Sequence, residues 1–222
     1  MQAKTVTKQL PLFYQHNINE YTRLGVWKIT EPEHFFSGKV PLQREITHPH
    51  KKLQHLAGRY LLTQLFPDFP YEEILIADTR KPYLPYEQYH FSISHCGDYA
   101  AAIVSSSNRV GIDIEIPTAK IEKIKHKFLN EKELSKMQEV ISDFGFWISD
   151  LEALTILWSS KEAVFKWWGW GSVDFREHIL LQPSVLAAEG KMAASFVRDK
   201  EVFPLSAHYK LFEKLCLVWV VS

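Results

Sequence analysis

The chain has little cysteine and no excess of charge. Its only two cysteines, Cys96 and Cys216, lie far apart and match neither a disulfide framework nor a metal-ligand spacing. We therefore expect a reducing compartment, the cytoplasm. Lys and Arg together number 26, as do Asp and Glu. This balance argues against a polybasic nucleic-acid binder and against a disordered acidic chain.

Long hydrophobic runs are also missing. The longest late run, from Leu215 to Val221, is too short to cross a bilayer and suits a buried C-terminal strand. The segment from Met1 to Lys8 has no apolar core of signal-peptide length. We therefore expect neither a targeting segment nor membrane association.

The sequence does contain helix and strand patterns that interleave in both halves. A helical period runs from Lys51 until Pro67 ends it, and another covers 151–168, with Ser149 or Asp150 as the N-cap. The late strands have hairpin spacing, which favours antiparallel pairing and an α+β class. The other expected elements are a mostly irregular stretch over 31–50, helices over 120–128 and 131–140, and strands over 12–18, 24–29, 74–77, 89–94, 99–105, 110–116, 179–181, 194–197, 207–212 and 215–221.

The predicted strand 110–116 carries two acidic residues. Side chains alternate along a strand, so Asp113 and Glu115 point to one face while valine and isoleucine fill the other. Two carboxylates so close raise each other's pKa unless a cation neutralises them, and a divalent ion with oxygen ligands commonly does so. An ordinary half-solvated strand shows the same alternation, so the strand by itself leaves both interpretations open.

The predicted helix 151–168 adds a third carboxylate and a cation. Trp158, Glu162 and Lys166 are spaced i, i+4, i+8 and therefore share one face. Taken alone, Glu162 and Lys166 fit a plain surface ion pair. Combined with the acidic strand, they describe a magnesium site that leaves coordination positions for water and a substrate phosphate.

Three segments in this order carry a family resemblance, namely 91–95, 110–115 and 158–166. With these segments the chain resembles the 4'-phosphopantetheinyl transferases. It is similar to their long, surfactin-synthetase-activating branch, because members of the short branch are much smaller and assemble as trimers. The resemblance is strong over 81–171 and weak elsewhere.

This resemblance implies a reaction and a fold. Members transfer the phosphopantetheine arm of coenzyme A to a serine of an apo acyl, peptidyl or aryl carrier protein, with Mg²⁺ on the pyrophosphate, and release adenosine 3',5'-bisphosphate. The implied fold has two similar α+β lobes related by a pseudo-twofold axis, here 1–108 and 109–222. The lobes form a monomer with the coenzyme A cleft between them, and neither nucleic acid nor a membrane is a partner.

The resemblance also implies roles for individual residues. Asp113, Glu115 and Glu162 would hold the metal, Glu162 would deprotonate the attacking serine, directly or through a water, and Lys166 would offset phosphate charge. The implied coenzyme A contacts are Ser94 and His95 with the phosphates, Lys81 and Pro82 with the nucleotide, Arg59 with Lys51 or Lys52 at the 3'-phosphate, and Lys161 with either a phosphate or a carboxylate.

The chain departs from the family pattern in two places. Arg80 stands where the family has the glycine of Gly-Lys-Pro, which puts the local backbone shape in question because arginine lacks glycine's extra conformations. After the catalytic helix come Trp167, Trp168 and Trp170. These side chains either line the pantetheine channel or pack in the core.

A basic stretch over 120–128 is followed by Phe144, Phe146 and Trp147. Carrier proteins are typically acidic around their serine, so this surface would steer and dock them. A solvated helix face is the alternative interpretation.

Two other functions compete with transfer. A Mg²⁺-dependent coenzyme A or nucleotide phosphohydrolase could use the same carboxylates to position a water instead of a serine. A non-catalytic paralogue could bind coenzyme A or a carrier without transfer. Product analysis separates the first, because hydrolysis needs no carrier protein.

Overall fold

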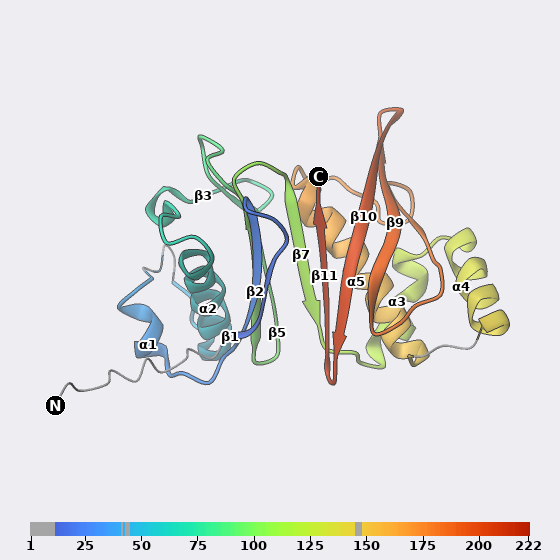
Figure 1. The fold of residues 1–222 in the computed structure, drawn as a ribbon, viewed down its shortest axis with the longest axis horizontal. Coiled ribbons are helices and arrows are strands. Elements are labelled where there is room, and N and C mark those ends of the chain that lie inside the picture. Colours follow the sequence, from blue (N-terminus) through green and yellow to red (C-terminus); the bar gives the residue numbers. More distant parts are fainter. Residues whose placement is uncertain (1–11, 41, 43–44, 145–147) are drawn as a thin grey trace.

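The computed structural model describes residues 12–40, 42, 45–144 and 148–222, and the side chains of 141–144 lie outside this description. Two antiparallel sheets stand side by side, and each is covered by one long helix (Figure 1). Strands and helices are mixed in both halves of the chain, which confirms the α+β class predicted from the sequence.

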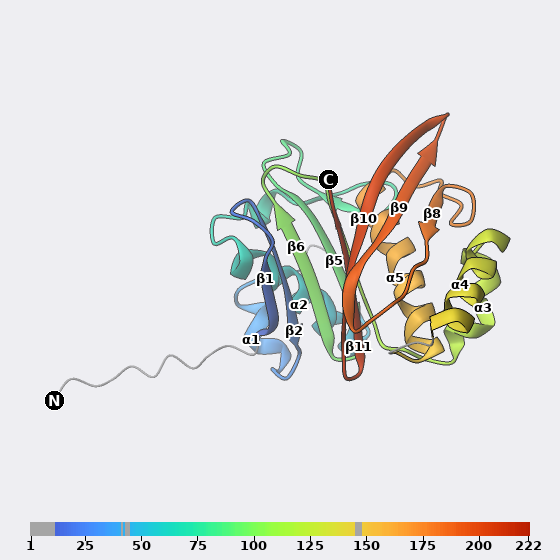
Figure 2. The same cartoon turned by 45° about the vertical axis from the view of Figure 1, so that its right-hand side comes forward.

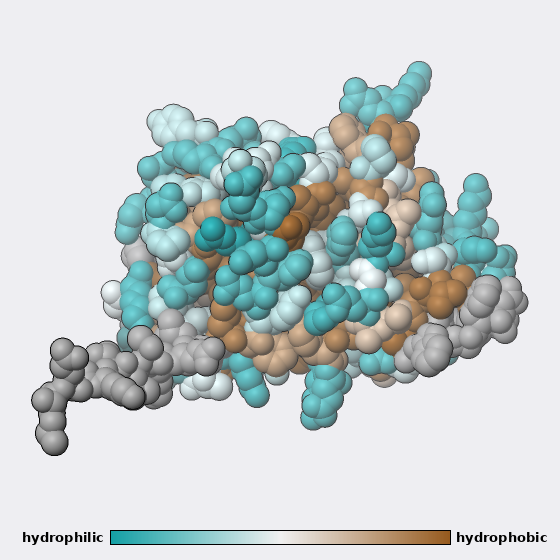
Figure 3. Space-filling model, viewed as in Figure 1, coloured by the Kyte–Doolittle hydropathy of each residue, from teal (hydrophilic) through white to brown (hydrophobic). Residues whose placement is uncertain are grey.

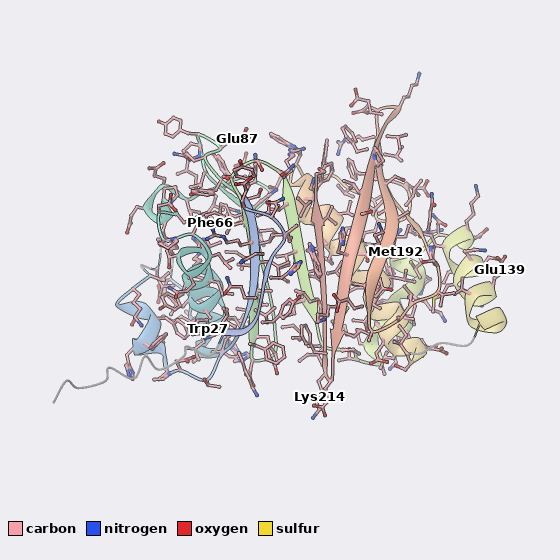
Figure 4. The ribbon with its side chains drawn as sticks, viewed as in Figure 1. Trp27, Phe66, Glu87, Glu139, Met192 and Lys214 are labelled. Carbon is pink, nitrogen blue, oxygen red and sulfur yellow. The ribbon has the colours of Figure 1, made fainter. Side chains whose placement is uncertain are left out.

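The first sheet has the strand order β1-β2-β6-β5 and packs against helix α2 (Pro49–Leu65). Trp27 and Phe66, both labelled in Figure 4, belong to the core between this sheet and the helix. The strands are β1 (Leu12–Asn17), β2 (Thr22–Lys28), β5 (His90–Cys96) and β6 (Tyr99–Ser105). The remaining elements are α1 (Glu33–Ser37), a 3-10 turn (Tyr71–Glu73), and the short pair β3 (Leu75–Ile76) and β4 (Pro82–Tyr83).

The second sheet has the order β7-β11-β10-β9-β8 and packs against helix α5 (Asp150–Trp168). Ser149 caps α5 in a capping box with Glu152, which settles the choice of N-cap that the sequence left open. Helices α3 (Lys120–Phe128) and α4 (Glu131–Phe144) lie beyond α5 (Figure 2). The strands are β7 (Val110–Glu115), β8 (Ile179–Gln182), β9 (Glu189–Arg198), β10 (Glu201–Phe212) and β11 (Leu215–Val221).

A separate hydrophobic core joins the two sheets. It includes Leu24 and Ile103 from the first sheet and Ile112, Ile114 and Leu217 from the second, all fully buried. The apolar face of β7 therefore packs in this junction, and its acidic face is turned toward α5. On the surface, a band of hydrophobic residues runs between the sheets toward the β9–β10 hairpin, within a mostly hydrophilic face (Figure 3).

Gly111 brings α5 directly onto β7. A side-chain carbon at this glycine would collide with the carbonyl of Ala163 and lie 2.7 Å from the backbone nitrogen of Trp167. Only glycine permits this backbone contact. The close approach places the α5 side chains against the acidic face of β7.

The predicted elements agree with the structure in type, with a few differences in extent. Helix α1 was missed inside the stretch predicted to be mostly irregular, because five residues are too few to show a helical period. Strands β9 and β10 are longer than predicted and form a projecting hairpin (Figure 1). No helix in the described part of the chain is long and apolar enough to span a membrane. The lobe boundary after residue 108 stays a prediction.

Candidate active site

Asp113 is the centre of a buried polar group formed by three elements. Its side chain, on β7, is 3% exposed. Its Oδ1 accepts hydrogen bonds from Lys166 Nζ on α5 at 2.6 Å and from Ser94 Oγ on β5 at 2.8 Å. Lys166 Nζ also donates to Ser94 Oγ at 2.9 Å. One strand of each sheet and the long helix of the second sheet therefore meet at a single carboxylate.

The other oxygen of Asp113 is open. Oδ2 is buried and has no hydrogen-bond partner among the described residues. Leaving a carboxylate oxygen buried and unpaired costs about 1–3 kcal/mol or more. Such a cost persists at functional sites when a ligand satisfies the group, and a cation is the matching ligand for a carboxylate.

The charges of Asp113 and Lys166 shift the pKa values of two further carboxylates, Glu115 and Glu162. Burial raises the pKa of Glu162 to about 7, against the attraction of Lys166, and the negative charges of Asp113 and Glu115 raise it further. Burial also raises the pKa of Glu115, and Asp113 adds to this increase. The pKa values of Glu115 and Glu162 are therefore both raised, and a positive charge beyond that of Lys166 would stabilise their ionised forms.

No three His, Cys, Asp or Glu side chains are arranged as a ready-made metal cluster within the described ranges. Lys166 is bound to Oδ1 of Asp113 instead. The open Oδ2 and the raised pKa values of Glu115 and Glu162 nevertheless fit a divalent cation, because all the donors are hard oxygens and the three carboxylates share the charge of Lys166. We conclude that the residues suit Mg²⁺ chemically.

Ser94 and His95 differ in exposure, because Ser94 is buried and His95 is exposed. Ser94 is 7% exposed and uses its hydroxyl on Asp113, so it orients the carboxylate. His95 is exposed beside it. Partial loss of solvent lowers the pKa of His95, and Lys166 and Lys51 contribute to this decrease. His95 is therefore a mostly neutral hydrogen-bonding group near pH 7.

Lys81 and Pro82 line a cavity of about 410 Å³ at the end of α5. Burial lowers the pKa of Lys81 to about 8, and the nearby Arg109 contributes. The cavity walls include the three tryptophans whose role the sequence left open, Trp167, Trp168 and Trp170. Arg109 lies over them, with its guanidinium carbon 5.4–6.0 Å from their ring centres. The cavity combines aromatic walls with two cations.

Arg80 keeps the backbone conformation that a glycine would supply. Its φ is 66°, in the left-handed region that L-residues rarely adopt. The turn therefore keeps a glycine-like shape although arginine replaces the family's glycine, and the arginine backbone is strained as a result. Gly169, which ends α5 with φ 78°, packs against the Lys81 side chain across the cavity.

The basic residues of α2 are not gathered at one point. Arg59 is 4% exposed and lies against Tyr71, with its guanidinium carbon 5.8 Å from the ring centre. Its side chain is therefore not part of a solvated helix face. Lys52 pairs with Glu33 at 2.6 Å, whereas Lys51 is exposed.

Lys161 is not part of the polar group around Asp113. It is fully buried, and its Nζ donates to both carboxylate oxygens of Glu133 at 2.8 Å. Of the two alternatives for Lys161, contact with a phosphate or with a carboxylate, the structure shows the carboxylate.

The basic stretch forms α3, beside a smaller cavity of about 160 Å³ that Glu115 and Trp158 help to line. Lys123 is exposed, and Lys125 lies 3.7 Å from Glu122. Phe146 and Trp147, and the side chain of Phe144, lie outside the described residues.

Sequence reasoning missed two residues. Arg109 precedes β7 and keeps the odd-numbered spacing of Asp113 and Glu115, so strand alternation could have placed it on the same face. Glu133 follows Asn130 by three residues, which is a capping-box pattern at the start of α4. Its contact with Lys161 had no sequence signal.

The chain is similar to known proteins. The model of the 4'-phosphopantetheinyl transferase superfamily matches residues 109–220. The chain is 36% identical over 172 residues to enterobactin synthase component D of Escherichia coli K12, and the match covers 75% of each protein. It is 32% identical over 137 residues to 4'-phosphopantetheinyl transferase AcpT of Escherichia coli O157:H7, covering 58% of this chain and 67% of AcpT.

Proposed function

The chain belongs to the 4'-phosphopantetheinyl transferase superfamily, and we propose that it moves the phosphopantetheine arm of coenzyme A onto a serine of an apo carrier protein, releasing adenosine 3',5'-bisphosphate. It is an enzyme of this transferase type, and coenzyme A is the family's substrate. The observation that supports the proposal best is the buried Asp113, with one oxygen on Lys166 and the other open, beside two carboxylates of raised pKa.

In the proposed mechanism Asp113, Glu115 and Glu162 would hold Mg²⁺, whose positive charge would offset the negative charge of the substrate's pyrophosphate. Lys166 adds a second positive charge beside Asp113, where charge develops as the phosphoanhydride bond breaks. Ser94 keeps Asp113 in place through its hydroxyl. The open oxygen of Asp113 is the position that lacks a partner without the ion.

Glu162 is the proposed base for the carrier serine. Burial raises the pKa of Glu162 to about 7 when no cation is bound, and a cation at the site would lower this pKa and keep the carboxylate ionised, as a proton acceptor must be. The attacking serine oxygen forms a bond to the β-phosphorus while the bridging oxygen leaves with adenosine 3',5'-bisphosphate. Glu162 receives the serine proton, directly or through a water.

The nucleotide of coenzyme A is proposed to bind in the cavity lined by Lys81, Pro82 and the tryptophans. Its planar base matches the aromatic walls, and its phosphates match Lys81 and Arg109. His95 provides a hydrogen bond to the phosphates. Arg59 and Lys51 stay proposed contacts of the 3'-phosphate.

The carrier is proposed to dock on α3, whose last turn carries Lys125, His126 and Lys127. An acidic carrier would be attracted to this helix and would bring its serine toward Glu115 and Glu162. Changing Lys123 and Lys125 to Glu should raise the KM for the carrier several-fold while the KM for coenzyme A stays constant. An unchanged carrier KM would remove α3 from the docking surface. Membership of the long, monomeric branch and a cytoplasmic site of action are part of the same proposal.

Intact-protein mass spectrometry tests transfer. Acyl, peptidyl and aryl apo carriers are incubated with the enzyme, coenzyme A and Mg²⁺, in parallel with a chelator. We expect one carrier to gain the mass of one phosphopantetheine arm, with no gain in chelator. Cleavage of coenzyme A without any gain on a carrier would instead support a phosphohydrolase, and intact coenzyme A would support a non-catalytic binding protein.

A further inference from the structure

The Lys161 and Glu133 side chains form an ion pair in which every charged atom is satisfied. Lys161 Nζ donates to Glu133 Oε1 and Oε2 at 2.8 Å, to the carbonyl oxygen of Phe175 at 2.8 Å and to that of Ile179 at 2.5 Å. The two side chains are 0% and 3% exposed. No solvent-facing role in binding a substrate is open to this lysine.

Glu133 extends the contact into two more elements. Its Oε1 accepts a hydrogen bond from the backbone of Leu181 on β8 at 2.8 Å, and its Oε2 accepts one from the backbone of Asn130 at 2.9 Å. Asn130 Oδ1 in turn accepts from the backbone of Glu133, which completes the capping box of α4. One carboxylate thus joins α4, β8 and the catalytic helix α5.

A buried ion pair is a poor way to gain stability alone. Replacing such a pair by apolar side chains of similar volume is often neutral or stabilising, because desolvating the charges offsets their attraction. The hydrogen bonds of Lys161 are directional, so they constrain the rotation of α5 about its axis in addition to the constraint from its buried apolar residues.

Ala163, which follows Glu162 in the sequence, is also held in place. The carbonyl of Ala163 lies directly over Gly111 of β7. Successive residues of a helix are rotated by about 100°, so Glu162 lies between one neighbour held by Glu133 and another held by β7. We propose that the Glu133–Lys161 pair is a positioning device that turns α5 so that Glu162 faces Asp113 and Glu115. This inference rests on the proposed function of Glu162.

The test replaces the pair by apolar side chains, Glu133→Leu with Lys161→Met, so that no buried charge is left unpaired. The matched control makes the same exchange at Glu139 and Lys136, an exposed ion pair on α4 at 3.0 Å. For each folded protein, kcat and the KM for coenzyme A are measured, and Mn²⁺ binding is measured by electron paramagnetic resonance. Glu133→Gln, which keeps the shape of Glu133 and removes its charge, is measured alongside in case the double variant does not fold.

We expect the buried double variant to lose at least tenfold in kcat and in Mn²⁺ affinity while the KM for coenzyme A changes less than threefold. Glu133→Gln should lose about threefold in both, and the exposed control should lose neither. Unchanged kcat and Mn²⁺ affinity in a folded buried variant would overturn the positioning role. If the wild type transfers nothing, the proposed function fails, and the Mn²⁺ comparison still tests positioning.

Discussion

Helix α5 carries two lysines that each meet a buried carboxylate, and the two pairs differ in how completely they are satisfied. Lys161 and Glu133 have a hydrogen-bond partner for every charged atom. Lys166 and Asp113 leave Oδ2 of the aspartate buried without a partner in the described chain. We call the Lys161–Glu133 pair closed, because all its charged atoms have partners, and the Lys166–Asp113 pair open, because Oδ2 has none. A closed pair holds structural elements together, whereas an open pair can still bind a cation. We call the side of α5 with Lys161 the supporting side and the side with Glu162 and Lys166 the reacting side.

The largest expected effect is at Glu162, on the reacting side. Glu162→Gln removes the proposed base and one metal ligand, so kcat for carrier modification should fall about 10³-fold with the fold intact. Initial rates by mass spectrometry measure the loss. Glu177→Gln, an exposed residue after α5, is the control and should keep full activity. A loss below tenfold at Glu162 would contradict the role assigned to it.

Truncating each lysine compares the two pairs directly. Lys166→Met should lower kcat about 10²-fold, because a charge beside the breaking bond is lost. Lys161→Met should lower kcat less, and both variants should lower the free energy of unfolding by about 3 kcal/mol, because each leaves a buried carboxylate without its lysine. Urea unfolding and initial rates are measured on both. A larger rate loss at Lys161 than at Lys166 would contradict the difference between the two pairs.

The raised pKa of Glu162 predicts a pH-dependent stability difference. In the folded chain its pKa is about 7, above the ordinary 4.5, so the folded state holds this proton more tightly than the unfolded state does. Stability from this group is therefore fully present below pH 4.5 and is lost as pH rises through about 7. In chelator, Glu162→Gln should be about 2 kcal/mol more stable than wild type at pH 8, with the gap narrowing as pH falls through about 7 and closing below pH 4.5. A gap that is constant with pH would mean that Glu162 is not desolvated.

The smallest expected effect concerns the strained turn beside the cavity. Arg80→Gly removes a positive-φ arginine, and should stabilise the fold by about 0.5 kcal/mol after the added freedom of the unfolded chain is counted. Asp78→Gly, at a residue without positive φ, should destabilise it. Thermal unfolding of both variants measures the difference, and destabilisation by Arg80→Gly would show that the arginine side chain makes a stabilising contact.

The reacting side of α5 could be read from the sequence because its signals are local. Strand alternation put Asp113 and Glu115 together, and helical spacing put Glu162 and Lys166 on one face. The supporting side could not be read, because Lys161 and Glu133 are 28 residues apart and meet only through packing. The cavity was equally hidden, since Lys81 is far in sequence from Trp167, Trp168 and Trp170 and lines the same cavity only in the folded chain.

In the proposed site the open pair needs a cation, and unfolding of wild type and Glu162→Gln at pH 8 tests this most directly. Each protein is measured first in chelator and then with Mg²⁺ and coenzyme A. The account predicts that the variant is the more stable protein in chelator and that the order reverses when Mg²⁺ and coenzyme A are present. The same order under both conditions would contradict the claim that Glu162 completes a metal site with Asp113.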